Sequence, residues 1–511
     1  MPTQLERQYN TPETKSKRSL NFTGLDHITL EVSTIRELDD FLASATIPDI
    51  QARFANGSLT SETLVAYYIQ RIKTYDVDGY NSVLELNPDA LDIARQCDAE
   101  RTSGQSSLYG IPVLLKDNIG TGDKMHTTAG AKALEFSQCD RDAFIVKQLR
   151  EAGAIILGKC NLSEWANFMS FDSANGFTVL GGQTKNAYGK FDVGGSSSGS
   201  GSAVSAGLAT VTIGTETSGS LVSPASQNGV CTLKPSLGLI SRDRIIPITE
   251  GQDTAGPMTR SMTDLAHFLT VLAGVDENDP QTQKTASIAN TDFTQYLDKD
   301  ALRGKRIAIT QHEQDPKEGD SIFLDRVAEV MTSAGATVVR IPYLEVDFSL
   351  WAYFYAMNAG VNAYLSAIGD DRTLADLVAF NAEDEQNRAP FGQGLLHLAS
   401  ITPLTPEMKK AHERLHYTNA SDASHAVRAT LRDLEVDAIV DINNYSTYAY
   451  AVSGFPAVSV PTGYRESGEP VNITIFGDYL QDAELIALAY AYEQLTQVRK
   501  APKLILPADR D

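Results

Sequence analysis

Apolar residues recur along the chain with two different periods, and these periods predict helices alternating with strands. Residues 61–75 carry apolar side chains at helical spacing behind Thr60 or Ser61 as an N-cap, and residues 142–152 show a second helical pattern that stops at Gly153. Short apolar, β-branched runs lie at 111–115, 154–157, 306–309, 438–440 and 457–460. Buried strands between helices are typical of a layered α/β fold with a mostly parallel or mixed sheet.

The periodic pattern begins only near Thr34, and this start divides the chain. We expect residues 1–34 to form a flexible N-terminal arm and residues 35–505 to form a single domain. Within this domain, residues 275–303 and 340–435 are more polar and aromatic, and they include a long helical run over 406–434. Residues 275–435 are therefore expected to contain the more variable region that covers the core.

Composition and charge limit the classes of partner. The 511 residues are 42% hydrophobic and 21% charged, which suits a large globular core, and the net charge of −22 disfavours binding to nucleic acid or to an anionic membrane. No run of 18 apolar residues occurs, and the first residues lack the apolar core of a secretory signal. The cysteines lie far apart without a CxxC pair, so we expect no disulfide or zinc framework and a cytoplasmic location. No oligomeric state is indicated.

Residues 194–226 are so rich in glycine and serine that composition alone is typical of a flexible linker. Their pattern predicts packed structure instead. An apolar helical segment at 203–209 and a strand at 210–213 lie between two turns of small residues, at 194–199 and 214–220. The two turns are therefore expected to be held rigidly, as catalytic loops are.

A reactive serine in these turns needs a base, because a serine hydroxyl alone is a weak nucleophile. None of the eight histidines lies in a Gly-x-Ser-x-Gly elbow. Lys116 is the candidate base, because it ends the apolar strand over 111–115. Burial at such a strand end lowers the pKa of a lysine, and a neutral lysine accepts a proton.

Lys116, the Gly-Gly-Ser-Ser-Ser-Gly run at 194–199 and the Gly-Thr-Glu-Thr-Ser-Gly-Ser run at 214–220 together resemble the amidase signature family. Residues 57–65, 158–166, 454–461 and 488–494 also match its motifs. The resemblance implies an amidase-signature fold, a large mixed β-sheet covered by helices on both faces. The form of the second run, with segments 181–186, 241–247 and 252–258, is more similar to the peptide-amidase branch than to the tRNA-dependent amidotransferase subunit.

The resemblance also implies roles for individual residues. Ser220 matches the nucleophile that forms an acyl-enzyme, Ser196 the bridging serine that follows a cis peptide bond, and Lys116 the base. The oxyanion hole is expected at the main-chain N–H groups of Thr217, Ser218, Gly219 and Ser220. Met169 and Ser170 are expected to bind substrate, with further pocket residues in 125–128, 351–358 and 443–450. No cofactor and no metal are implied.

These roles predict a serine hydrolase of amides, with carbamates and esters as further possible substrates. Val222 stands where many relatives carry an arginine, so this position supplies no cation for a substrate carboxylate. The aromatic segments 351–355 and 445–450 suit apolar or peptide-like groups. We therefore expect a neutral small-molecule amide or a C-terminal peptide amide as substrate.

Three other interpretations stay open from the residues alone. His412, Glu413 and His416 form a literal H-E-x-x-H motif, the pattern of a zinc metalloprotease, although its basic flanks favour a solvated helix face and only His425 or Glu435 could supply a third ligand. A catalytically inactive relative that serves as a binding protein is the second. A nucleotide site at 199–204 is the third, but this run lacks the dinucleotide fingerprint and no P-loop follows.

Overall fold

The computed structural model describes residues 2–509, and in this range eleven strands form one mixed sheet in the order β1-β3-β2-β6-β8-β7-β12-β13-β11-β9-β10. Strand β2 runs parallel to β3 and β6, whereas β8 runs antiparallel to β6 and β7. The strands of this sheet are β1 Val83–Leu86, β2 Pro112–Lys116, β3 Ile155–Cys160, β6 Val211–Glu216, β7 Cys231–Lys234, β8 Thr254–Thr259, β9 Arg306–Gln311, β10 Thr337–Pro342, β11 Ala438–Ile442, β12 Ala457–Tyr464 and β13 Pro470–Phe476. A separate small pair consists of β4 Phe177–Thr178 and β5 Gly182–Gln183.

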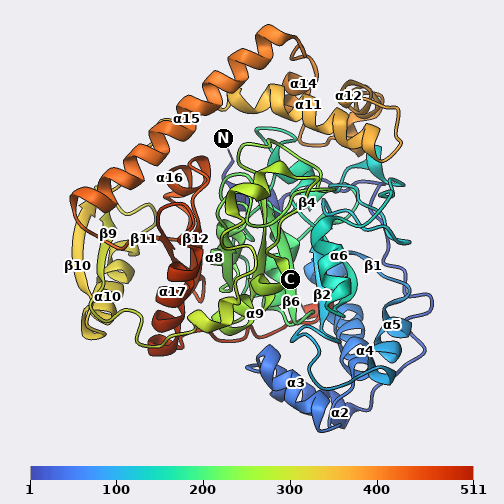
Figure 1. The fold of residues 1–511 in the computed structure, drawn as a ribbon. Helices are drawn as coiled ribbons and strands as arrows, with labels where there is room; N and C mark the ends of the chain where they lie inside the picture. The colour runs from blue at the N-terminus through green and yellow to red at the C-terminus, as the bar shows by residue number, and fades with distance from the viewer. Residues whose placement is uncertain (1, 510–511) are drawn as a thin grey trace.

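Helices surround this sheet (Figure 1). Their bounds are α1 Gln4–Tyr9, α2 Val32–Leu42, α3 Ile47–Ala55, α4 Ser61–Arg71, α5 Ala90–Ala99, α6 Phe144–Glu151, α7 Ser198–Ser205, α8 Val222–Gln227, α9 Met262–Leu272, α10 Asp320–Ser333, α11 Trp351–Ala367, α12 Leu374–Ala382, α13 Glu385–Arg388, α14 Gly394–Ser400, α15 Pro406–Asp433, α16 Thr447–Val452 and α17 Asp482–Thr496.

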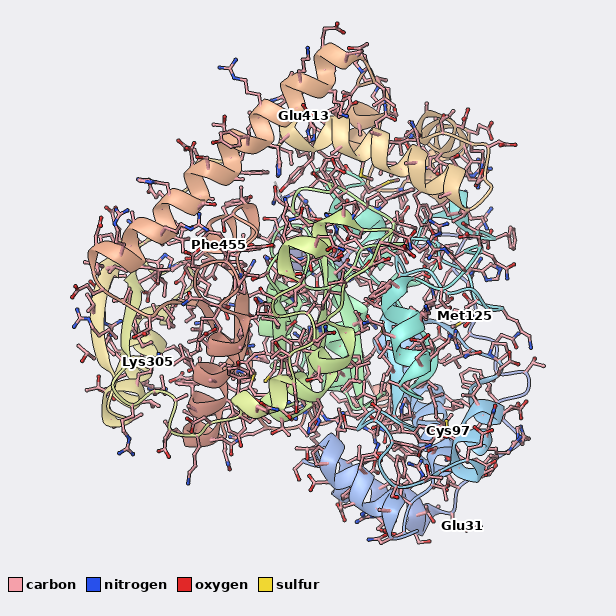
Figure 2. The ribbon with its side chains drawn as sticks, viewed as in Figure 1. Glu31, Cys97, Met125, Lys305, Glu413 and Phe455 are labelled. Atoms are coloured by element: carbon pink, nitrogen blue, oxygen red, sulfur yellow. The ribbon has the colours of Figure 1, made fainter. Side chains whose placement is uncertain are left out.

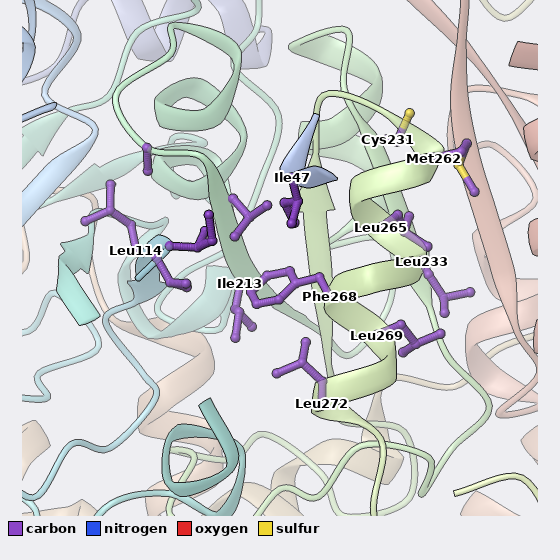
Figure 3. Packing of buried hydrophobic residues seen from close by; sticks show 14 of the residues in the cluster. Ile47, Leu114, Ile213, Cys231, Leu233, Met262, Leu265, Phe268, Leu269 and Leu272 are labelled. Carbon is purple, nitrogen blue, oxygen red and sulfur yellow. The ribbon is translucent and has the colours of Figure 1, made fainter. Parts of the chain in front are cut away.

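Alternate residues of the strands belong to two different hydrophobic cores. In β12, Val458 and Val460 join the large core that includes α9, α10 and α17, whereas Ala457 joins the core that contains Val222 of α8 and residues of α15 and α16. Figure 3 shows side chains of α9, Phe268 among them, pointing towards the strand residues of the large core. Because successive side chains of a strand point to opposite faces, helices cover both faces of the sheet, and the predicted fold class is confirmed.

The predicted elements occur close to their expected places. The helix predicted behind Thr60 is α4, and the Thr60 hydroxyl accepts a hydrogen bond from the N–H of Thr63. The long helix predicted over 406–434 is α15, and the five predicted strands are β2, β3, β9, β11 and β12. In the glycine-rich stretch the helix starts earlier than expected, at Ser198, and β6 continues to Glu216, so the second turn is shorter than predicted.

The region 275–435 contributes to two different parts of the fold. Its strands β9 and β10 extend one edge of the main sheet. Its later part, α11 to α15, forms a helical layer around a separate hydrophobic cluster, and α15 crosses the top of the molecule from α11 and α14 towards β9 and β10 (Figure 1). The covering role predicted for this region therefore falls to α11–α15, while β9 and β10 belong to the core sheet.

The N-terminal segment makes hydrogen bonds to the rest of the domain, and the flexibility expected of residues 1–34 stays a prediction. The side chain of Gln4 donates a hydrogen bond to the carbonyl of Ser173 at 3.0 Å, and that of Gln8, only 4% exposed, donates to Asp192 at 2.6 Å. Further along, the N–H of Arg18 donates to the carbonyl of Leu180. These anchors are polar, so a search for apolar periodicity does not detect them.

Gly199 in α7 gives a prediction about folding, because a Cβ at this position would lie 2.2 Å from the Asn161 carbonyl oxygen and 2.5 Å from that of Ser82. Both atoms are main chain and cannot move aside cheaply. We expect Gly199→Ala to lower the free energy of unfolding by about 2 kcal/mol or more, by analogy with other overpacked sites. Gly394 is the matched helical control, because no atom lies within 4 Å of its added Cβ. Thermal unfolding of the two variants checks this, and equal melting temperatures would contradict it.

Within residues 2–509, no helix combines the length and the apolar character that a membrane-spanning segment requires. The cytoplasmic location expected from the sequence stays a prediction.

Candidate active site

Lys116 is placed at the end of β2, in the middle of the sheet between β3 and β6, and its side chain is fully buried. Its Nζ lies 2.7 Å from Ser196 Oγ, 3.1 Å from Ser197 Oγ and 3.2 Å from the carbonyl oxygen of Thr215. Burial lowers the pKa of Lys116 to about 7, although the carboxylates of Glu216 and Asp253 oppose this shift. A lysine with this pKa is largely neutral in mildly alkaline solution.

The hydrogen bonds around Lys116 determine where its lone pair points. Ser197 Oγ donates to the Thr215 carbonyl at 2.9 Å, so its own proton is used and it accepts from Lys116. The Thr215 carbonyl also accepts from Lys116. A neutral lysine has two N–H bonds and one lone pair, so these two acceptors take both N–H bonds. The lone pair is then left for the hydroxyl of Ser196.

Ser196 lies at the entrance to α7, after a cis peptide bond between Gly195 and Ser196. Its carbonyl accepts a hydrogen bond from the N–H of Ser163 at 2.9 Å, and its side chain is fully buried. The next residue, Ser197, donates its N–H to the carbonyl of Ser220 at 3.2 Å. This hydrogen bond joins the first small-residue turn directly to the second. It holds Ser220 beside Ser197, the residue that follows Ser196 in the chain.

The second turn, Thr217 to Ser220, connects β6 to α8. Glu216 Oε2 accepts the N–H groups of Leu221 at 2.8 Å and Val222 at 3.2 Å, which fixes the start of α8. Gly219 has a φ of +81°, a conformation that glycine adopts without strain. Within the described chain, the four N–H groups predicted for the oxyanion hole, those of Thr217, Ser218, Gly219 and Ser220, donate no hydrogen bond. They are free to receive an anionic oxygen, as an oxyanion hole requires.

Thr217 is held from its other side by two neighbouring residues. Gln252 Nε2 donates to the Thr217 carbonyl at 3.1 Å, and the Thr217 hydroxyl donates to Asp253 Oδ1 at 2.6 Å. Asp253 Oδ2 in turn accepts the N–H groups of Ile248 and Thr249, and burial raises the pKa of Asp253 to about 6. In the sequence, residues 252–254 belong to a segment that is similar to the peptide-amidase branch, but the sequence does not predict that they position the turn.

A cavity of about 700 Å³ opens beside this turn. Its inner wall includes Asn118 and residues 215–217, and its outer wall includes the loop 242–254, the second half of α11 and His416 of α15. The expected pocket segment 351–358 lies in the first half of α11 and does not line this cavity, and neither do Lys116, Ser196 and Ser220, so the role of this segment in substrate binding stays a prediction. Asn444 and Thr447, from the expected segment 443–450, lie beside Gly219.

Met169 and Ser170, the residues expected to bind substrate, lie elsewhere in this structure. Met169 is 3% exposed, packs in the hydrophobic cluster under α11 and lines a separate cavity of about 10 Å³. Ser170 Oγ accepts the N–H of Asp172 at 3.2 Å. Neither residue lines the large cavity. Their role in substrate binding stays a prediction.

The H-E-x-x-H residues lie on α15 and form part of the cavity wall. His412 Nδ1 is hydrogen-bonded to the Ala352 carbonyl at 2.7 Å, and the His412 and His416 rings stack with centroids 6.1 Å apart. Glu413, labelled near the upper end of α15 in Figure 2, approaches Lys409 at 3.9 Å. Among the residues described, no group of three or more His, Cys, Asp and Glu side chains could hold a metal ion. The zinc hypothesis therefore finds no third protein ligand there.

Comparison with known proteins gives a consistent result. The family model described as Amidase matches residues 63–440. A probable amidase of Arabidopsis thaliana is 38% identical over 488 residues, covering 91% of this chain and 92% of the relative. The native peptide amidase from Stenotrophomonas maltophilia is 41% identical with a TM-score of 0.85, covering 90% of this chain and 99% of that one. An amidase family protein from Bacillus anthracis aligns with a TM-score of 0.90 at 36% identity, covering 94% and 97%.

The resemblance seen in the sequence motifs is thereby confirmed over most of the chain. The family match covers more than half of it, and both solved structures align with at least 90% of this chain. The chain belongs to the amidase signature family and is an amide-hydrolysing enzyme.

Proposed function

We propose that this enzyme hydrolyses neutral amides, above all C-terminal peptide amides, through an acyl-enzyme on Ser220. The observation that carries the proposal is the environment of Lys116. Its pKa is lowered to about 7, and its hydrogen bonds to Ser197 and to the Thr215 carbonyl leave the lone pair of the neutral amine for Ser196. Likeness to the Stenotrophomonas peptide amidase supports this choice of substrate. A solved structure of a peptide amidase that is 40% identical to this chain contains the competitive inhibitor chymostatin.

In the acylation step, Ser220 Oγ attacks the carbonyl carbon of the amide. The Ser220 proton passes to Ser196 Oγ, and the Ser196 proton passes to Lys116 Nζ, so Lys116 becomes an ammonium. The carbonyl oxygen gains the negative charge and receives hydrogen bonds from free N–H groups of the turn Thr217 to Ser220. When the C–N bond breaks, the relay returns one proton to the leaving nitrogen, and ammonia or an amine departs.

Deacylation repeats the same proton movements with water in place of Ser220. Water attacks the ester carbonyl while its proton travels through Ser196 to Lys116, and the released acid leaves Ser220 with its hydroxyl restored. Glu216 and Gln252 position the turn through main-chain groups in both steps, and Asp253 positions it through the hydroxyl of Thr217. These residues therefore act through the oxyanion hole and have no direct role in proton transfer.

The substrate class is tested by release of ammonia from a short acylated peptide amide, and by comparison with a matched compound that carries a carboxylate near the scissile bond. We expect the neutral compound to have the higher kcat/KM, because Val222 is fully buried and supplies no cation. Activity that disappears with o-phenanthroline and returns with zinc would instead favour the metalloprotease. A chain without hydrolytic activity or reaction with a fluorophosphonate probe would favour the inactive binding relative.

The pH dependence of hydrolysis follows from Lys116. Below its pKa of about 7 the lysine is protonated and cannot accept a proton, so log kcat/KM should fall by one for each pH unit. Above about pH 8 the lysine is neutral and the rate should reach a plateau. Measurement with a substrate that does not titrate between pH 5 and 9 checks this profile. A rate that is highest in acid and declines above pH 7 would contradict a lysine base.

A further inference from the structure

The large cavity beside the second turn has a strongly acidic wall. Among the described residues that line it, six carry carboxylates and two carry guanidinium groups. Burial and the neighbouring His412 lower the pKa of His416, so this ring adds no positive charge at neutral pH. The electrostatic potential inside a concave surface with an excess of carboxylates attracts cations.

Both arginines of the wall are already paired with protein carboxylates. Arg242 contacts Asp279 through Nε at 2.8 Å and through Nη2 at 2.6 Å. Arg244 contacts Asp140 through Nε at 2.6 Å and through Nη2 at 2.8 Å. In each arginine the Nε and Nη2 groups together bind one carboxylate, so neither guanidinium is available to bind an anionic ligand in the same way.

Two carboxylates of the wall are paired with arginines, Asp279 with Arg242 and Asp243 with Arg141, whereas within residues 2–509 Glu250 and Glu413 have no such partner. In the chain as described, the Glu250 side chain makes no hydrogen bond or salt bridge, and Glu413 has only the 3.9 Å contact with Lys409. Deeper in the wall, Glu216 is 1% exposed and its Oε1 is buried without a hydrogen-bond partner. Asn118, 3% exposed, likewise has an unpartnered buried Oδ1. The oxygens of Glu216 and Asn118 are buried, so the carboxylates that a ligand in the cavity can reach are the exposed Glu250 and Glu413.

We propose that this cavity binds a cationic group of the substrate, an ammonium or a guanidinium, and that Glu250 and Glu413 select for it. The inference rests on the proposed function, because it takes the cavity lined by Thr217, three residues before Ser220, as the place of the substrate. It goes beyond a preference for neutral amides over acids, since it ranks a cationic amide above a neutral one of similar size. A lysine side chain, an arginine side chain or a free amino terminus of a peptide amide has the required chemistry.

The test compares kcat/KM for acylated dipeptide amides that carry lysine, norleucine or glutamate, placed in turn at each of the two positions. At one position we expect lysine to exceed norleucine by about tenfold and glutamate to be the poorest, with the ratio falling as salt is added. Glu250→Gln and Glu413→Gln should each reduce the ratio of lysine to norleucine. Glu407→Gln is the matched control, an exposed glutamate on α15 outside the cavity wall, and it should keep the ratio.

The two levels of the proposal fail in different ways. If norleucine amides are not hydrolysed, the proposed function fails. In that case, calorimetric binding of lysinamide and norleucinamide to the intact protein still tests the cavity, and tighter binding of lysinamide that is lost in Glu250→Gln supports it. If norleucine amides are hydrolysed but lysine gives no advantage at either position, the inference is overturned. A lysine preference that survives in both glutamate variants overturns it as well.

Discussion

Replacing Ser220 by alanine is expected to reduce kcat/KM for a peptide amide by about 10⁴-fold or more, the scale seen when a serine nucleophile is removed. The variant loses the only atom that forms the acyl bond in the proposed mechanism. It should keep its fold, because removing one hydroxyl leaves the main-chain contact between the Ser220 carbonyl and the N–H of Ser197 in place. Steady-state kinetics and mass spectrometry of the trapped acyl-enzyme measure the two effects.

Ser223→Ala is the matched control for this experiment. Ser223 lies in α8 three residues after Ser220, is half-buried, and its side chain makes no hydrogen bond in the described part of the chain. It should retain wild-type kcat/KM and probe labelling. An acyl-enzyme detected in Ser220→Ala, or equal losses in both variants, would remove Ser220 from the nucleophile's role.

Replacing Lys116 by methionine should lower kcat by about 10²- to 10⁴-fold, the usual contribution of a general base. Methionine keeps most of the buried volume but cannot accept the proton of Ser196. The residual activity should lose the rise between pH 6 and 8, because the group that titrates there is gone. A pH–rate profile of the variant therefore separates loss of the base from general damage.

Lys234 offers a close control for the lysine substitution. It is also fully buried, and burial lowers its pKa to about 8, but its Nζ donates to the carbonyl of Pro235 instead of to a serine. Lys234→Met should cost stability and leave the pH profile unchanged. Adding Ser196→Ala to Lys116→Met should reduce the rate far less than the product of the two single effects, because both residues serve one relay. Independent, multiplying effects would rule out the relay.

Local sequence pattern was sufficient for the scaffold of the site. The apolar run before Lys116 became β2, and the helix predicted over 406–434 became α15. These elements are set by side-chain periodicity within a short window, which the sequence displays directly. The roles of Lys116, Ser196 and Ser220 came from motif resemblance, since neither serine is distinguishable from its neighbours by periodicity alone.

Contacts between distant segments could not be predicted in this way. The hydrogen bonds of Gln4 to Ser173 and of Lys116 to Thr215 join residues 169 and 99 positions apart. The first connects the N-terminal segment to the loop that contains Ser173. The second takes one of the two N–H bonds of a neutral Lys116. Polar pairings of this kind follow no period, so only folded coordinates display them.

The sequence by itself determined the class of the fold, the family and the two small-residue turns, because each depends on residue types at fixed local spacing. Only the tertiary structure decided how those turns work. Ser197 and Thr215 direct the lone pair of Lys116, Gln252 and Asp253 hold Thr217, and the H-E-x-x-H helix lines an acidic cavity. The physical reason is that burial, proton assignment and cavity charge are properties of groups brought together from several elements, and none of them belongs to a single stretch of chain.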